Sequence, residues 1–201
     1  MKEIKASVGD EGIELFKNTI FGPYLNIPKC NFQGQITKCL LLLELQQDNT
    51  NVLHIRHANM SVLQFSIKDF SIITGLKCKS NVKDLTYSEF TSSQLLQMYF
   101  PDATINLIKS RLVQRFLMGN YETTQDAVQI AIIYFVHTFI LCQLGETSIP
   151  IDEFLMVEDG RYQLYPWGQI TFTKLMKSLK QDFNLDKQMY RLSGMPYALN
   201  V

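Results

Sequence analysis

The stretch Ala127–Gly145 has the sequence AVQIAIIYFVHTFILCQLG, and it decides the fold class because it contains no charged residue. Its length approaches the roughly 20 apolar residues that a helix needs to cross a membrane. However, Gln129, His137 and Gln143 interrupt it, and polar groups are costly in hydrocarbon. Its flanks are acidic and carry no basic anchors. We therefore expect the central core helix of a globular domain, with no membrane contact.

Apolar residues recur at helical spacing on both sides of this stretch, and glycine or proline ends most of the runs. Thr104, for example, is the expected cap of a helix that carries Leu112 and Phe116 on its apolar face and ends at Gly119. We expect helices over about residues 13–20, 35–45, 66–75, 92–100, 104–119, 124–145, 151–157 and 170–183.

Residues 52–57 and 62–66 alternate apolar and polar side chains, which predicts two strands joined by a short turn. Leu53 and Ile55 would share one face of this hairpin, as would Leu63 and Phe65 on the return strand. We therefore expect a mainly α fold, a compact multi-helix domain with one small antiparallel β-hairpin at about residues 52–66. Residues 1–12 lack a pattern and are expected to form a flexible tail before a single globular domain over residues 13–201.

The charge of the chain is balanced, with 19 basic and 19 acidic residues and a formal net charge of +0. Nucleic-acid binders usually show a basic excess or a basic stripe, whereas the basic residues here are scattered in short groups. The mixed, charged first residues do not resemble a secretory signal, so an intracellular setting is expected.

No catalytic or metal-binding pattern stands out among the cysteines and histidines. His137 is five residues from Cys142, a spacing that is off-face on a helix, and a core histidine satisfied by a neighbour is expected there. Cys30 and Cys39 are nine residues apart, which is not the spacing of a zinc knuckle, and His54 and His57 point to opposite faces of a strand. We expect no catalytic residues, no metal and no cofactor.

The segment Tyr165-Pro166-Trp167-Gly168 is the candidate for a site of another kind. Exposed aromatic residues anchor protein partners, so these residues could form an interaction surface. They could equally form a structural turn that packs into the core. The sequence leaves both possibilities open.

Several motifs in order resemble a known family. They are Phe21–Pro28, Phe32–Gln35 leading into Leu40–Leu43, Phe65-Ser66, Ile73–Leu76, Tyr99-Phe100, Tyr165–Gly168, Ser178–Lys180 and Tyr190–Leu199. Together they are similar to the plant domain of unknown function nineteen eighty-five (DUF1985). The resemblance implies a gene derived from a mobile element, a nuclear setting and an accessory role, because the family often precedes a ubiquitin-like (SUMO) protease domain. It implies no protease activity here, since the protease half is not in this chain.

Two functions remain open from the sequence. The first is a non-catalytic accessory domain that binds a protein partner, consistent with the neutral charge and the family setting. The alternative is a nucleic-acid-binding accessory domain, suggested by a hairpin next to a helix. An enzyme of a new type is a third possibility, for which His137 near Cys142 is the place to look. The sequence leaves the oligomeric state open.

Overall fold

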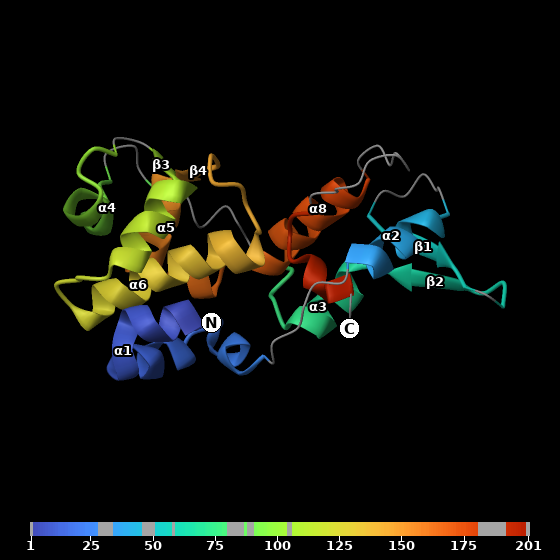
Figure 1. Cartoon of the computed structure of the whole chain (residues 1–201), viewed down its shortest axis with the longest axis horizontal. Coiled ribbons are helices and arrows are strands. Elements are labelled where there is room, and N and C mark those ends of the chain that lie inside the picture. Colours follow the sequence, from blue (N-terminus) through green and yellow to red (C-terminus); the bar gives the residue numbers. More distant parts are fainter. Residues whose placement is uncertain are drawn as a thin grey trace. The chain divides into compact units, whose positions relative to one another are not determined.

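The computed structural model describes residues 2–27, 34–45, 51–57, 59–79, 87, 91–103, 106–180 and 192–199 (Figure 1). Over these residues the chain is mainly helical, as predicted, and it has eight α-helices and two small two-stranded antiparallel sheets. The helices are α1 (Lys2–Lys17), α2 (Gly34–Leu42), α3 (Ile67–Thr74), α4 (Gln94–Tyr99), α5 (Lys109–Met118), α6 (Thr124–Phe135), α7 (Ile151–Glu158) and α8 (Trp167–Leu179). The strands are β1 (Leu53–Arg56), β2 (Val62–Phe65), β3 (Asn106–Ile108) and β4 (Ser148–Pro150). Short turns of other helix types are η1 (Gly22–Asn26), η3 (Val136–Ile140), η4 (Arg161–Gln163) and η5 (Pro196–Leu199).

The contacts of the chain fall into two compact units, which are described separately below. Unit 1 comprises Met1–Lys29, Asn81–Phe139 and Gln143–Tyr165, and unit 2 comprises Cys30–Ser80, Ile140–Cys142 and Pro166–Val201. From the sequence, one globular domain is expected over residues 13–201. Because neither unit is one continuous stretch, no linker in the sequence marks a boundary between them.

Helix α6 lies at the centre of unit 1. From Ala127 to Phe135, every residue except Gln129 is buried, which explains why this stretch carries no charge. The ring of Phe16 on α1 meets the ring of Phe135 edge-on at 5.9 Å between centroids. On another side, Phe116 of α5 stacks on Tyr134 at 4.0 Å. The expected core helix is therefore confirmed.

The predicted end of this helix at Gly145 was wrong. The α-helix stops at Phe135, η3 continues it as one π-helical turn, and Cys142 adopts a left-handed conformation with φ of 48°. The buried ring of His137 lies 2.5 Å, Nδ1 to Oε1, from the side chain of Gln143. A straight helix would hold these two side chains on different faces, so the chain must turn back for them to meet.

The expected flexible tail over residues 1–12 is corrected to a helix, since α1 begins at Lys2. Ile4 and Val8 are buried, and Gly9 interrupts the helix with φ of 69°. Tyr134 of α6 donates a hydrogen bond to Glu3 at 2.6 Å. Two apolar residues around a glycine are too sparse a pattern to predict this helix, and contacts with α6 supply the missing stabilisation.

The helix predicted from Thr104 begins later, at Lys109, because the preceding residues form β3. Leu107 and Ile149 are register partners in the pairing of β3 with β4, and both are buried. This second sheet was not predicted, and its two strands lie about forty residues apart in the chain. The expected end of the helix at Gly119 is confirmed.

Unit 2 is built around α3 and α8, whose rings Phe70 and Phe172 lie 5.5 Å apart. The spacing of Ser66 and Asp69 predicts an acidic capping box before α3. The backbone N–H of Ser66 donates to Asp69 Oδ2 at 2.8 Å, which forms this box. Gly75 ends α3 in a left-handed conformation with φ of 70°, as the pattern indicates. The local signals around this helix are therefore all confirmed.

The predicted hairpin is confirmed as β1 and β2, paired antiparallel with Leu53 opposite Phe65 and Ile55 opposite Leu63. The main chain just after α2 pairs with the other side of β1. Leu45 N–H donates to His54 O at 2.8 Å, and Arg56 N–H donates to Leu43 O at 2.9 Å. Helix α2 therefore ends at Leu42 rather than continuing to residue 45. In Figure 1, α2, β1 and β2 follow one another in this order.

Candidate functional site

The segment Tyr165-Pro166-Trp167-Gly168 lies at the start of α8. Pro166 holds the N-cap position, and Trp167 is the first helical residue and only 2% exposed. Gly168 is also buried, and a Cβ added to it would lie 2.5 Å from Cys78 Sγ. Pro166, Trp167 and Gly168 thus make a tight packing junction inside unit 2, which leaves no exposed aromatic face at Trp167.

His137 is fully buried in unit 1, between Gln143 and Glu153. Its Nε2 lies 2.8 Å from Glu153 Oε2, an ion-pair distance without the angles of a good hydrogen bond. Its Nδ1 contacts Gln143 Oε1 at 2.5 Å. These polar neighbours hold a fully enclosed ring, an arrangement that positions the chain after α6.

The residues considered as zinc ligands do not gather in the part of the chain that the structure describes. Cys39 is exposed on α2, whereas His54 is buried on β1 and His57 is exposed. Cys30 lies outside the described residues. No group of three His, Cys, Asp or Glu side chains in the described ranges is placed to hold a metal ion.

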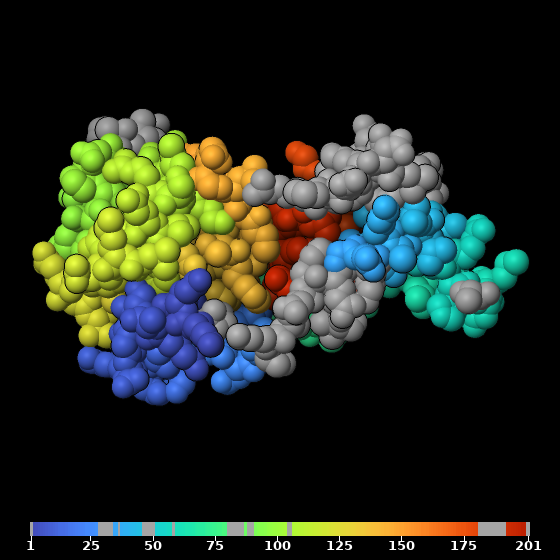
Figure 2. Space-filling view, in the orientation of Figure 1, coloured from blue at the N-terminus to red at the C-terminus, as the bar shows by residue number. Residues whose placement is uncertain are grey.

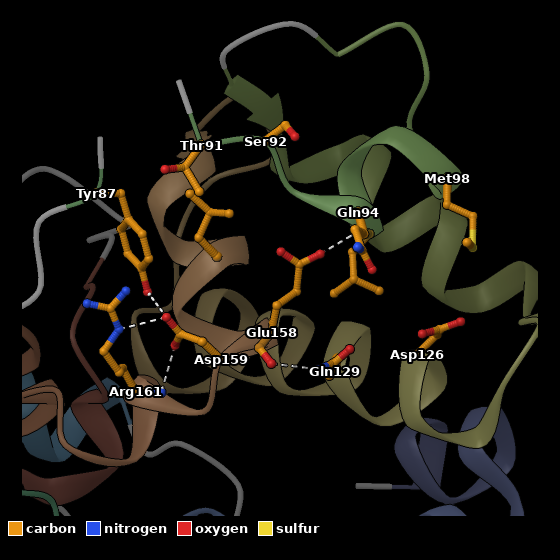
Figure 3. Close-up of a pocket in the computed structure, with 12 residues that line it drawn as sticks. Tyr87, Thr91, Ser92, Gln94, Met98, Asp126, Gln129, Glu158, Asp159 and Arg161 are labelled. Atoms are coloured by element: carbon orange, nitrogen blue, oxygen red, sulfur yellow. Dashed lines mark hydrogen bonds and ion pairs between the residues drawn. The ribbon is translucent and has the colours of Figure 1, made fainter. Parts of the chain in front are cut away.

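An open cleft of about 670 Å³ lies in unit 1, among residues of α4, α6, α7 and η4 (Figure 3). Its volume is in the range of ligand-binding pockets. The described residues of its lining provide three carboxylates, one guanidinium, several amides and hydroxyls, and three apolar side chains. They are Tyr87, Thr91, Ser92, Gln94, Leu95, Met98, Asp126, Gln129, Leu155, Glu158, Asp159 and Arg161. The chemistry of this cleft follows from how its charged groups are held.

Glu158 joins α7 to the start of α4. Its Oε1 accepts a hydrogen bond from Leu95 N–H at 2.6 Å and from Ser93 Oγ at 3.1 Å. Ser93 Oγ in turn accepts from Leu96 N–H at 3.0 Å, so two free amides of α4 are capped. Figure 3 shows the Glu158 carboxylate turned toward this helix. The side chain is thereby fixed at the cleft wall.

Tyr87 and Arg161 converge on Asp159 at one end of the cleft (Figure 3). Tyr87 Oη donates to Asp159 Oδ2 at 2.7 Å, and Arg161 Nε donates to the same oxygen at 2.6 Å. The guanidinium also lies over the Tyr87 ring, 4.1 Å from its centroid. This cluster ties residue 87 to the turn that follows α7.

The protonation states of this cluster follow from its contacts. Burial acts to raise the pKa of Asp159, but hydrogen bonds from Arg161 and Tyr87 outweigh it and hold that pKa below its ordinary value. Burial, together with the hydrogen bond to Asp159, raises the pKa of Tyr87 above its ordinary value. At neutral pH the phenol is therefore a neutral donor and the carboxylate is charged.

Asp126 is the third carboxylate of the lining. Its Oδ2 accepts a hydrogen bond from Tyr99 Oη at 2.8 Å. Gln129, one turn further along α6, donates to the backbone oxygen of Glu158 at 3.4 Å. The side chain of Met98, which is 48% exposed, lines the same cleft from α4. The cleft therefore offers carboxylate acceptors beside an exposed apolar side chain.

Glu158 and Asp159 directly precede Gly160, a pattern that predicts solvated acids of a turn. Asp159 does stand in that turn, but Glu158 ends α7 and reaches Leu95, 63 residues away in the chain. No local pattern signals a contact of that separation. The only local hint was the pairing of two acids directly after an apolar helix.

The family model described as "Domain of unknown function (DUF1985)" matches residues 41–178, more than half of the chain. The chain belongs to this family. The motifs before residue 41 and after residue 178 that support the resemblance lie outside the matched range. No curated protein and no solved structure matches the chain.

Among the described helices, none is both long enough and apolar enough to span a membrane. Helix α6, with 12 residues, is well short of the roughly 20 that a span requires.

Proposed function

We propose that this chain is a non-catalytic accessory domain that binds another protein, and that the cleft of unit 1 receives a segment of that partner. The observation that carries the proposal is the lining of the cleft. Carboxylates held in fixed positions line the same cleft as the exposed side chain of Met98. A partner segment with a basic side chain and an adjoining apolar residue would match both.

The charge of the cleft separates this proposal from nucleic-acid binding. Among the lining residues that the structure describes, Asp126, Glu158 and Asp159 face a single cation, Arg161, whose guanidinium is already paired with Asp159. Phosphate groups are bound by clustered Lys and Arg side chains, so this lining would repel a nucleic-acid backbone. The cleft therefore supports a protein partner and gives no support to the alternative.

Site-specific photo-crosslinking tests the proposal directly. A photoreactive amino acid replaces Met98 in the cleft, and the control carries it at Met118 of α5, which is 61% exposed and does not line the cleft. Both are methionines of unit 1, so the two variants differ mainly in position. We expect discrete protein adducts from a nuclear extract at Met98 and none of the same proteins at Met118.

Two outcomes would contradict the proposal. One is an identical set of adducts from both positions, which would show non-specific contact. The other is adducts at Met98 that nuclease treatment removes, which would show that nucleic acid occupies the cleft. In parallel, a salt series with random single- and double-stranded DNA should show no binding that weakens steeply with added salt.

A further inference from the structure

Strand β2 has one side that is not paired within the described residues. In an antiparallel pair, the backbone groups of alternate residues point toward the partner strand and away from it. His57 N–H donates to Ser61 O, so residues 57 and 61 point toward each other. Ile55 and Leu63 lie two positions further along their strands and therefore also bond each other. The backbone groups of Val62 and Gln64 must then point outward.

The other strand of the hairpin confirms this alternation. His54 and Arg56 of β1 point away from β2, and their backbone groups bond Leu45 and Leu43 on the far side. No described residue forms such backbone hydrogen bonds with the outward side of β2. Val62 and Gln64 thus present two N–H donors and two C=O acceptors along a free sheet edge.

The free edge also lacks the features that natural proteins use to protect such edges. Charged side chains, especially lysine, and proline usually block edge pairing. Here the sequence contains no charged residue and no proline from residue 58 to 67. Val62 is 45% exposed, Leu63 52% and Met60 87%. Figure 2 shows the hairpin, in turquoise, at the surface of unit 2.

We propose that a second copy of this chain pairs with β2 through the same edge, antiparallel and about a two-fold axis at Leu63. Val62 then lies opposite Gln64 of the partner subunit, and Gln64 opposite the partner's Val62. Each outward N–H meets an outward C=O, which makes four hydrogen bonds and continues the sheet across both copies. The two Leu63 side chains meet at the axis.

A second copy fits this edge because the edge is complementary to itself. The spacing of two residues between Val62 and Gln64 is what a symmetric antiparallel pair requires, and most soluble oligomers use such two-fold contacts. The uncharged sequence brings no like charges face to face. A four-residue strand covers less than a standard interface, so we expect a dimer that dissociates on dilution. This inference is independent of the cleft of unit 1.

The first measurement is analytical ultracentrifugation of the full chain over a wide concentration range. We expect a reversible monomer–dimer equilibrium. Gln64→Pro removes one outward N–H but no hydrogen bond to β1, and proline is tolerated on an edge strand. This variant should sediment as a monomer while its far-ultraviolet ellipticity and tryptophan emission stay unchanged.

A disulfide trap gives the register. Leu63→Cys places two thiols at the symmetric position, where opposed Cα atoms are about 4.5 Å apart, within the reach of a disulfide. Gln64→Cys is the matched control, because its copy in the partner lies diagonally across, about 8 Å away by strand geometry, and cannot be bridged. Mild oxidation should cross-link Leu63→Cys far faster than Gln64→Cys or the unchanged chain. Peptide mapping should identify a bond between the two introduced cysteines.

Three results would overturn the inference. The first is a chain that stays monomeric at every concentration. The second is a dimer that persists in Gln64→Pro, since its contact would lie elsewhere. The third is equal cross-linking of the two cysteine variants, because the register would then not be the symmetric one. None of these bears on the photo-crosslinking at Met98, so the protein-binding proposal stands or falls separately.

Discussion

Replacing Gly168 with alanine tests the packing junction at the start of α8. A Cβ at this position would lie 2.5 Å from Cys78 Sγ, 2.8 Å from Leu76 O and 2.9 Å from Lys77 O. Two of these three atoms belong to the main chain and cannot swing aside as a flexible side chain would. The start of α8 must therefore move away from residues 76–78.

The cost of that movement can be estimated from its parts. Overpacking a well-packed site typically costs about 1–3 kcal/mol. The hydrogen bond from Gly168 N–H to Lys77 O, 2.9 Å long, would weaken or break, which costs about 0.5–1.5 kcal/mol more. Alanine favours the helix over glycine by up to about 1 kcal/mol, which offsets part of the loss. We expect Gly168→Ala to lower the free energy of unfolding by about 1–4 kcal/mol.

Urea denaturation with two probes measures this change. Trp167, the one tryptophan of the sequence, is buried beside Gly168, so its emission reports the unfolding of unit 2. Far-ultraviolet ellipticity reports the helices of both units. With a slope of about 2 kcal/mol per molar urea, the midpoint of the tryptophan transition should fall by roughly 0.5–2 M.

Gly145→Ala is the matched control, because a Cβ there would meet only Ser110 Cβ at an ordinary 3.8 Å. Its midpoint should move by less than the equivalent of about 0.5 kcal/mol. Equal midpoints for Gly168→Ala and the unchanged chain would contradict this expectation. They would mean that residues 76–78 yield easily and that the start of α8 is not a tight junction.

Three further predictions concern stability. Glu158→Ala removes the acceptor of Leu95 N–H and should lower the free energy of unfolding by about 1–2 kcal/mol, measured by urea denaturation followed by ellipticity. Glu158→Gln keeps an acceptor oxygen and should lower it less, so equal losses of stability in the two variants would contradict the capping role. Hydrogen bonds from Ser66 hold the pKa of Asp69 below its ordinary value. As the pH falls below about 4, the Asp69 carboxylate is therefore protonated more readily in the unfolded chain than in the folded one, and unit 2 should lose stability. Asp69→Asn should flatten that part of the pH profile of tryptophan-detected midpoints, and an unchanged profile would count against the capping box. Burial raises the pKa of Tyr162 from 10.0 to about 12, so stability should fall as the pH rises above about 10. Tyr162→Phe should make this loss smaller, and an identical alkaline profile would disprove the assignment.

Features that depend on residues a few positions apart could be predicted from the sequence. Ser66, Asp69 and Gly75 bracket one short helix, and the structure confirms both its cap and its end. The alternation of residues 52–57 and 62–66 predicted the hairpin for the same reason. Within a turn or a hairpin, the hydrogen bonds that form are between neighbours in the chain, so the pattern and the structure correspond.

The candidate site could not be predicted in this way. The cleft depends on Glu158 reaching Leu95 and on Tyr87 reaching Asp159, contacts across 63 and 72 residues. The aromatic segment ending in Trp167 and Gly168 could be located in the sequence. Its burial against residues 76–78 could not, because exposure depends on what packs over a residue rather than on the residue itself.

The mainly helical character of this chain, the uncharged core helix from residue 127 onward and the hairpin before a capped helix could all be predicted without the structure. Three features became evident only in the folded chain: residues 2–17 are helical, β3 pairs with β4, and the core helix ends in a π turn around a buried His137. The physical reason is the same in each case. These elements are marginal alone, and their stability comes from partners distant in the chain, which no local pattern encodes.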